Sequence, residues 1–247
     1  MDEWMVLYQE PLDNPMRVLT IYVAQGLACV FLIFIAYKII KRDRKRLNLI
    51  FSGTYISAAI GLIINMIYGP IANEGVVLFL NYLTNFGIFY SPIFLVVFDL
   101  ILLKSEKVIT TLKQFAILIG YGIVMFCMIF FVITEDWGVS INEDTEWSPV
   151  WELPFFLYLV IVESIAVGPL LYLSFQIYQK FEDDQLKKKW RFFIFGFCAF
   201  IIFMYAIFLS NFLDVSDIRA LMGGIGLILA IAGGYLMYNG VGRQLEK

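Results

Sequence analysis

Long runs of apolar residues alternate with short polar links along the 247 residues of this chain. Each run has at least the roughly 20 residues that an α-helix needs to cross about 30 Å of hydrocarbon. The runs cover residues 17–40, 47–69, 76–103, 112–134, 151–178, 190–213 and 218–241. The pattern predicts an all-α membrane protein, a seven-transmembrane helix bundle over residues 17–247, preceded by an N-terminal segment at residues 1–16. Because most links are short, sequential helices are expected to be antiparallel neighbours.

Basic side chains occupy alternate links. Of the 18 lysines and arginines, all but two lie in or beside residues 38–46, 104–113 and 180–191 or in the tail after residue 241. The two exceptions are Arg17 and Arg219. By the positive-inside rule, the side with most of the positive charge faces the cytoplasm. The N-terminal segment is therefore expected to be extracellular and the C-terminus cytoplasmic, in a multi-pass protein of the cell membrane.

Composition agrees with a membrane protein. Hydrophobic residues form 61% of the chain and charged residues 16%, whereas soluble domains have about 45–50% and 25%. Acidic side chains gather in the links opposite the basic ones, where they either solvate the outer loops or attract cations. The acidic start, with Asp2 and Glu3, does not resemble a cleavable signal, so the first run is expected to remain as a helix.

The sequence offers little for catalysis. It has no histidine, and its three cysteines, Cys29, Cys127 and Cys198, lie in three different apolar runs. Haem ligation, histidine-containing zinc or copper sites and nucleophile–histidine pairs are therefore excluded, and no metal or cofactor is expected. Asp99 and Glu163 lie at different depths, which argues against a pair of catalytic carboxylates. The chain is not expected to be an enzyme.

Two carboxyl groups lie within the apolar runs, where a charge costs roughly 3 kcal/mol. Glu163 is near the middle of the fifth run. It is either a proton- or cation-sensitive switch, a ligand contact, or a neutral acid that is hydrogen-bonded to a neighbouring helix. Asp99 lies about one turn before Lys104 and is expected to form a structural ion pair near the inner rim, with Lys38 and Lys113 as further partners within reach.

Uncharged polar residues gather in the outer halves of several runs. Amides rarely face lipid, so they are expected either to line a polar cavity open to the outside or to join helices by hydrogen bonds. Pro92 and Pro169 permit kinks at comparable depth. The candidate ligand pocket lies between the first, second, third, fifth and sixth runs, with Glu163 at its floor. It comprises Gln25, Asn65, Asn81, Asn85, Glu163, Tyr205 and Asn211.

The longest outer link, residues 135–150, is rich in acids and contains Gly138 and Pro149. We expect a solvated loop there, with a short hairpin or a lid over the helix ends as the alternatives. Trp137, Trp147 and Trp151 predict an aromatic belt at the outer membrane interface, because an indole combines an apolar body with a polar N–H.

The last run is rich in small residues. Gly226, Ala230 and Gly234 follow one another at four-residue spacing and so form a ridge on one helix face. Such a ridge allows two helix backbones to approach closely. It predicts tight packing within the bundle, or alternatively a seam between two copies of the chain.

Markers of several seven-helix families are absent, because the last run has no lysine for a retinal Schiff base and the third does not end in Asp-Arg-Tyr. Residues 178–196 (YQKFEDDQLKKKWRFFIFG) place Gln185 and the lysines 187–189 before the pair Trp190–Arg191 and an apolar helix. This stretch resembles the link between the fifth and sixth helices in the seven-transmembrane N-terminal sensor regions of prokaryotic histidine kinases. The resemblance implies a sensor. The sequence has no phospho-acceptor histidine and no Gly-rich nucleotide loop. The resemblance therefore implies either that the chain is part of a longer protein or that it signals through another protein.

The leading hypothesis is a receptor or sensor that couples an outer stimulus or ligand to a cytoplasmic signalling protein. Alternatives are a carrier or channel for a small solute or cation, and a noncatalytic subunit of a larger membrane assembly. Expected partners are the lipid bilayer and a second copy or larger assembly, and no nucleic acid. The candidate docking surface for the signalling protein is basic, and its charges either bind that protein or only fix the topology and contact anionic lipid. It comprises Arg42, Arg44, Lys45, Arg46, Lys187, Lys188, Lys189 and Arg191.

Overall fold

The computed structural model describes residues 12, 15–134 and 137–242. Within them, seven helical segments are long and apolar enough to cross a membrane, which confirms the predicted bundle. They cover Leu19–Arg42, Arg46–Tyr68, Glu74–Lys104, Thr111–Val132, Leu153–Lys180, Asp184–Leu213 and Leu221–Val241. The chain is a multi-pass membrane protein. Most of the predicted N-terminal segment, residues 1–16, lies outside the described residues.

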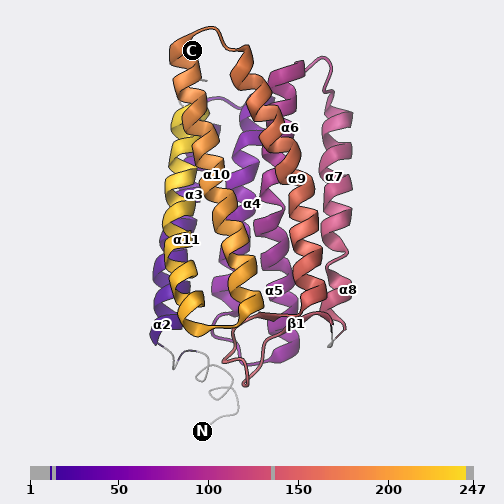
Figure 1. The fold of residues 1–247 in the computed structure, drawn as a ribbon, viewed down its shortest axis with the longest axis vertical. Coiled ribbons are helices and arrows are strands. Elements are labelled where there is room, and N and C mark those ends of the chain that lie inside the picture. Colours follow the sequence, from indigo (N-terminus) through magenta and orange to yellow (C-terminus); the bar gives the residue numbers. More distant parts are fainter. Residues whose placement is uncertain (1–11, 13–14, 135–136, 243–247) are drawn as a thin grey trace.

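The spanning segments lie side by side along the long axis of the molecule (Figure 1). The most extensive helix contacts join α10 to α11, α3 to α4, and α4 to α5. In chain order the elements are α2 (Pro15–Val18), η2 (Leu19–Ala24), α3 (Gln25–Arg42), α4 (Arg46–Tyr68), α5 (Glu74–Phe89), α6 (Ser91–Lys104), α7 (Thr111–Phe126), α8 (Ile129–Val132), β1 (Val139–Ser140), β2 (Val150–Trp151), α9 (Leu153–Lys180), α10 (Asp184–Leu213), α11 (Ser216–Met237) and η4 (Tyr238–Gly242).

The two ends of the bundle differ in charge. The end with α2 and the strands β1 and β2, here called the hairpin end, also holds the α4–α5 and α10–α11 links (Figure 1). The opposite end, here called the basic end, holds the links 43–45, 105–110 and 181–183. Arg17 and Arg219 lie at the hairpin end, and the other described basic side chains lie at or near the basic end.

The sixth span begins earlier than the predicted residue 190. The side chain of Asp183 caps α10 by accepting hydrogen bonds from the backbone N–H groups of Gln185 at 2.6 Å and Leu186 at 3.1 Å. Only residues 181–183 separate α9 from α10, so the prediction of a basic loop over residues 180–191 was wrong. The length of an apolar run cannot locate the polar first turns of a helix that extends beyond the hydrocarbon.

The third span is one continuous helical segment, but its regular hydrogen bonding has a break at Tyr90, between α5 and α6, where the backbone keeps helical dihedral angles. Pro92 follows the break and has no N–H to donate to the Ile88 carbonyl oxygen, four residues before it. The hydroxyl of Ser91 donates to that oxygen instead, at 2.7 Å. Pro169, in contrast, lies inside α9, and the helix continues through it. The two prolines that were predicted to permit similar kinks therefore behave differently.

The glycines of the last span pack α11 tightly against α10. A Cβ atom on Gly233 would lie 2.5 Å from the Gly196 carbonyl oxygen, and one on Gly196 would lie 2.6 Å from the Gly233 carbonyl oxygen. A Cβ on Gly226 would lie 2.7 Å from the ring of Phe203. The predicted packing of the small-residue ridge within the bundle is confirmed at Gly226, and Ala230 is also buried.

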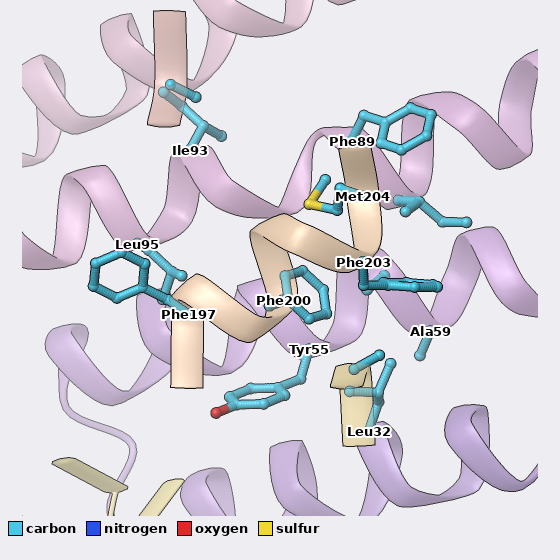
Figure 2. Packing of buried hydrophobic residues seen from close by; sticks show 14 of the residues in the cluster. Leu32, Tyr55, Ala59, Phe89, Ile93, Leu95, Phe197, Phe200, Phe203 and Met204 are labelled. Atoms are coloured by element: carbon cyan, nitrogen blue, oxygen red, sulfur yellow. The ribbon is translucent and has the colours of Figure 1, made fainter. Parts of the chain in front are cut away.

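Aromatic side chains fill much of the interior between these helices. Because lipid is as apolar as these side chains, close packing rather than transfer out of water stabilises this part of the core. Figure 2 shows side chains of α10 meeting those of α3, α4, α5 and α6. The labelled residues are Leu32, Tyr55, Ala59, Phe89, Ile93, Leu95, Phe197, Phe200, Phe203 and Met204.

The long outer link folds onto the bundle. Strands β1 and β2 pair in antiparallel fashion, with Val139 opposite Trp151. Ile141, Trp147 and Trp151 are buried, so the preferred prediction of a solvated loop was wrong and the hairpin alternative is confirmed. The predicted interfacial belt was also wrong for Trp147 and Trp151, whereas Trp137 is 63% exposed. A hydropathy pattern cannot separate an indole that faces the interface from one that a hairpin turns inward.

Candidate functional site

Four of the seven predicted pocket residues form two hydrogen-bonded groups near the hairpin end. The Asn65 amide of α4 donates to the Gln25 side chain of α3. On α5, Asn85 donates to Asn81 at 2.9 Å, and Asn81 donates to the hydroxyl of Tyr68 at 2.9 Å. These amides therefore bond one another or a tyrosine, and they join α3 to α4 and α4 to α5.

Glu163 and Tyr205 belong to two separate hydrogen-bonded pairs, one between α9 and α7 and one between α9 and α10. Glu163 is 1% exposed, and its Oε2 lies 3.3 Å from the hydroxyl of Tyr121 on α7. Next to it on α9, the Ser164 hydroxyl lies 2.7 Å from the Tyr205 hydroxyl on α10. Asn211 is buried near the end of α10, and no hydrogen bond among the described residues joins its side chain to the other predicted pocket residues.

A cavity in the bundle lies elsewhere. It is lined only by apolar side chains, including Leu32 of α3, Leu62 of α4, Phe203 of α10 and Leu227 of α11. None of the seven predicted pocket residues contributes to this lining. The candidate site is therefore best described by the hydrogen bonds around Glu163.

The Tyr121 hydroxyl faces three acceptors. Besides Glu163 Oε2, it lies 3.3 Å from the Phe89 carbonyl oxygen and 3.4 Å from the Val162 carbonyl oxygen. Phe89 is the last residue of α5, immediately before the break at Tyr90. A phenolic hydroxyl has one proton to donate and can also accept. Tyr121 therefore connects a buried carboxyl group with the backbone at a helix break.

The protonation state of Glu163 decides which acceptor Tyr121 can serve. A neutral Glu163 can donate its proton to the Tyr121 oxygen, which leaves the tyrosine proton for the Phe89 or the Val162 carbonyl. An ionised Glu163 has no proton to give and accepts the tyrosine proton, which removes that bond from Phe89. The second oxygen of Glu163, Oε1, is buried and has no hydrogen-bond partner among the described residues.

The same break contacts the hairpin. The ring of Phe89 packs edge-on against Trp151 of β2, with ring centroids 6.4 Å apart, and against Phe208 of α10 at 4.7 Å. Trp151 also packs against Phe155, near the start of α9, at 5.0 Å. A path of contacts thus leads from the hairpin to the Phe89 ring, and from the Phe89 backbone carbonyl through the Tyr121 hydroxyl to Glu163.

Arg17 and Arg219 hold the hairpin link in place. Arg17 donates to the Glu146 carbonyl oxygen at 3.0 Å and to the Gly69 carbonyl oxygen at 3.3 Å. Arg219 donates to the Pro149 carbonyl oxygen at 3.3 Å and pairs with Asp214 at 2.8 Å. Neither arginine was predicted to have this role, although both stand out in the sequence as the exceptions to the charge asymmetry.

The second buried acid, Asp99, is not paired with a lysine. Its Oδ2 accepts a hydrogen bond from the Ser174 hydroxyl of α9, and the indole N–H of Trp190 on α10 donates to the Ser174 carbonyl oxygen at 2.8 Å. Among the described residues, the lysine and arginine ion pairs are those of Lys45 and Arg219, so the prediction of an Asp99 ion pair was wrong. Lys104 is five positions after Asp99, which is about 140° around a helix, and this places the lysine on the exposed face.

Apolar residues separate the two acids. Glu163 and Ser174 are eleven positions apart on α9, about three helical turns, so they share a face of the helix. Between them that face carries Ala166, Leu170 and Leu173, all of them buried. The described face of α9 therefore provides no continuous polar path from Glu163 to Asp99.

The predicted docking residues fall into two segments of the chain. Arg42 ends α3, Arg44 and Lys45 lie in the link, and Arg46 begins α4. The remaining four, Lys187, Lys188, Lys189 and Arg191, lie on the first two turns of α10, where Lys188, Lys189 and Arg191 are exposed. Trp190 lies among them and points inward to Ser174.

Comparison with known proteins adds no relative. No protein-family model matches the chain, and no curated protein matches it.

Proposed function

We propose that this membrane protein is a sensor, in which a stimulus at the hairpin end changes the hydrogen bonding of Tyr121 and Glu163 and thereby the helices that reach the basic end. The observation that supports it best is the position of the Tyr121 hydroxyl between the Glu163 carboxyl group and the Phe89 carbonyl. That carbonyl lies at a helix break that the buried hairpin residue Trp151 contacts through the Phe89 ring.

The direction of signalling rests on the charge asymmetry. By the positive-inside rule the basic end is cytoplasmic and the hairpin end is outside. The exposed side chains Lys188, Lys189 and Arg191 would then meet a cytoplasmic signalling protein, as the resemblance of residues 178–196 to the kinase sensor regions also implies. A homodimer or a larger membrane assembly is also part of this proposal.

The experiment compares two variants at the site with two matched controls. A fluorophore that reports its surroundings is attached to Lys188→Cys at the basic end of the protein in lipid vesicles. Glu163→Gln removes the ionisable proton, and Tyr121→Phe removes the hydroxyl. Both are expected to shift the fluorophore spectrum, because each one fixes or deletes the bond to the Phe89 carbonyl.

The controls make the same chemical changes at exposed positions. Glu152→Gln lies just before α9, and Tyr172→Phe lies on the exposed face of α9, where Tyr172 is 64% exposed. Neither is expected to shift the spectrum. Identical spectra for the wild type and both site variants would show that the site is not coupled to the basic end.

A carrier or channel for protons or cations is the second candidate. The observation in its favour is Glu163 itself, a buried carboxyl group inside a span with one oxygen that has no hydrogen-bond partner among the described residues. Against it stands the apolar face of α9 between Glu163 and Ser174. Ion flux measured in the same vesicles decides between the two, because a sensor requires none. Flux that Glu163→Gln abolishes would favour the carrier.

A further inference from the structure

The residues 38–46 concentrate positive charge at the basic end. They include six lysines and arginines and a single acid, Asp43. Four of the six cations already have a partner on the chain. Lys38 lies over the ring of Phe34 at 4.7 Å, Lys41 lies over the ring of Tyr37 at 5.5 Å, Lys45 pairs with Asp43 at 3.0 Å, and Arg46 donates to Gln114 at 2.7 Å.

Arg42 and Arg44 differ from these four and from each other. Arg44 is exposed. Arg42 follows Ile35 and Ile39 on the buried face of α3, and all three nitrogens of its guanidinium group are shielded from solvent. Within the described part of the chain, none of these nitrogens has a hydrogen-bond partner. The single acid within residues 38–46, Asp43, forms its ion pair with Lys45.

A guanidinium group in this setting favours an anion. It carries five N–H donors in a planar fork, and a shielded charge without hydrogen bonds is unfavourable. The C-terminal end of α3 favours a positive charge through its dipole, but it does not fill that fork. Phosphate and carboxylate oxygens match the fork in bidentate fashion.

The neighbouring lysines indicate that the anion is a phosphate. Phe34 and Tyr37 are 50% and 56% exposed, so their rings lie on the surface that faces lipid. Lys38 and Lys41, lying over these rings, have the position of side chains that extend from the hydrocarbon toward the headgroups. Arg42 is next to Lys41 and so lies at the level where the phosphates of a bilayer are found.

We infer that Arg42 anchors a phosphate-binding site at the basic end of the bundle, between α3 and the link to α4. Arg46 provides a second donor in the same segment, because its Nη2 is also buried and has no partner among the described residues. The phosphate comes either from an anionic lipid headgroup or from a soluble phosphate compound. The site is independent of Tyr121 and Glu163 and does not rest on the proposed sensor function.

The test measures ligand-induced stabilisation of the purified protein in detergent. The thermal midpoint is followed with phosphatidylglycerol, with phosphatidylcholine, and with inorganic phosphate against chloride at equal ionic strength. The variants are Arg42→Gln and its neighbour Arg44→Gln, which removes the same charge from an exposed position. Arg42→Lys keeps the charge but loses the planar fork.

The wild type and Arg44→Gln are expected to be stabilised by phosphatidylglycerol or by phosphate, and more weakly or not at all by phosphatidylcholine. Arg42→Gln is expected to bind at least about tenfold more weakly, and Arg42→Lys to fall between. Stabilisation by the lipid alone identifies a headgroup site, and stabilisation by inorganic phosphate identifies a soluble ligand.

Two results would overturn the inference. One is a wild type that neither phosphatidylglycerol nor phosphate stabilises. The other is an equal loss in Arg42→Gln and Arg44→Gln, which would show a diffuse effect of surface charge. If Arg42→Gln does not fold, Arg42→Lys replaces it in the same comparison with Arg44→Gln.

Discussion

The two buried acids of this bundle are held in different ways. Asp99 accepts its hydrogen bond from Ser174, between two regular helices, and the Trp190 indole fixes the serine backbone. Glu163 meets a tyrosine hydroxyl that has two carbonyl acceptors besides the carboxyl group, beside a broken helix. Burial alone therefore does not identify a switch. What distinguishes Glu163 is that its partner can exchange one acceptor for another.

The comparison is tested most strongly by separating the Glu163 region from the hairpin. Trp151→Ala removes one of the largest fully buried side chains, and we expect it to lower the free energy of unfolding by about 3–5 kcal/mol. Trp137→Ala, at an exposed position, should change it by less than about 0.5 kcal/mol. Denaturation in mild detergent measures both. Equal effects would mean that the hairpin is not packed on the bundle as described.

A smaller effect is expected where the partner is fixed. Ser174→Ala leaves the buried Asp99 carboxyl group without its donor, and this should cost about 1–3 kcal/mol of unfolding free energy. The same substitution in an Asp99→Ala background should cost less, because no acceptor remains to be left unpaired. The double-mutant cycle checks this. No coupling between the two positions would contradict the assigned bond.

Tyr121→Phe should cost less than Ser174→Ala, at about 0.5–1.5 kcal/mol. Its three contacts are 3.3–3.4 Å long, and one proton serves only one acceptor at a time. Tyr172→Phe is the control and should have no measurable effect. If Tyr121→Phe is the more destabilising of the two site variants, the hydroxyl is a structural bond and not an exchangeable one.

The smallest effect is expected at Asp43, a partly exposed acid that serves as the reference for the two buried ones. The hydrogen bond from Lys45 lowers the pKa of Asp43 below its ordinary value. A lowered pKa in the folded state gives a stabilising contribution that is present above the unfolded pKa of about 3.9 and is lost as the pH falls through the folded value. The thermal midpoint of the wild type should therefore fall slightly more than that of Asp43→Asn on acidification from about pH 5 to pH 3. Equal shifts of the thermal midpoint in the wild type and in Asp43→Asn would show that the ionised Asp43 does not stabilise the folded state.

The sequence was sufficient for features that depend on the length of apolar runs. The seven spans follow from the thickness of the hydrocarbon layer, and the close packing at Gly226 follows from the spacing of small residues. The start of α10 was missed because its first turns are polar, although Asp183 is a recognisable cap. The Asp99 ion pair was predicted from distance along the chain, whereas the angle around the helix decides which side chains meet.

The site itself could be predicted only in part. Glu163 stands out because a carboxyl group is rare in the middle of a span. Tyr121 does not stand out in the sequence, since a tyrosine in an apolar helix usually packs like a phenylalanine, and its role depends on the break that brings the Phe89 carbonyl within reach. The inward turn of Trp151 depends on its pairing with Val139, twelve positions earlier, which a hydropathy pattern does not contain.

The contact of Gly196 with Gly233 has a mechanical consequence. Two helices whose backbones touch cannot slide without steric clash, so α10 and α11 form a stiff pair. Helix α7 stands at the edge of the bundle (Figure 1), and its main helix neighbour is α6. We therefore expect rearrangement to require the least energy at α7, which carries Tyr121 and belongs to the least buried of the seven spans. On this view α10 and α11 form the rigid part of the bundle and α7 the mobile part. The Tyr121 hydroxyl, which can donate to more than one acceptor, lies on the mobile helix.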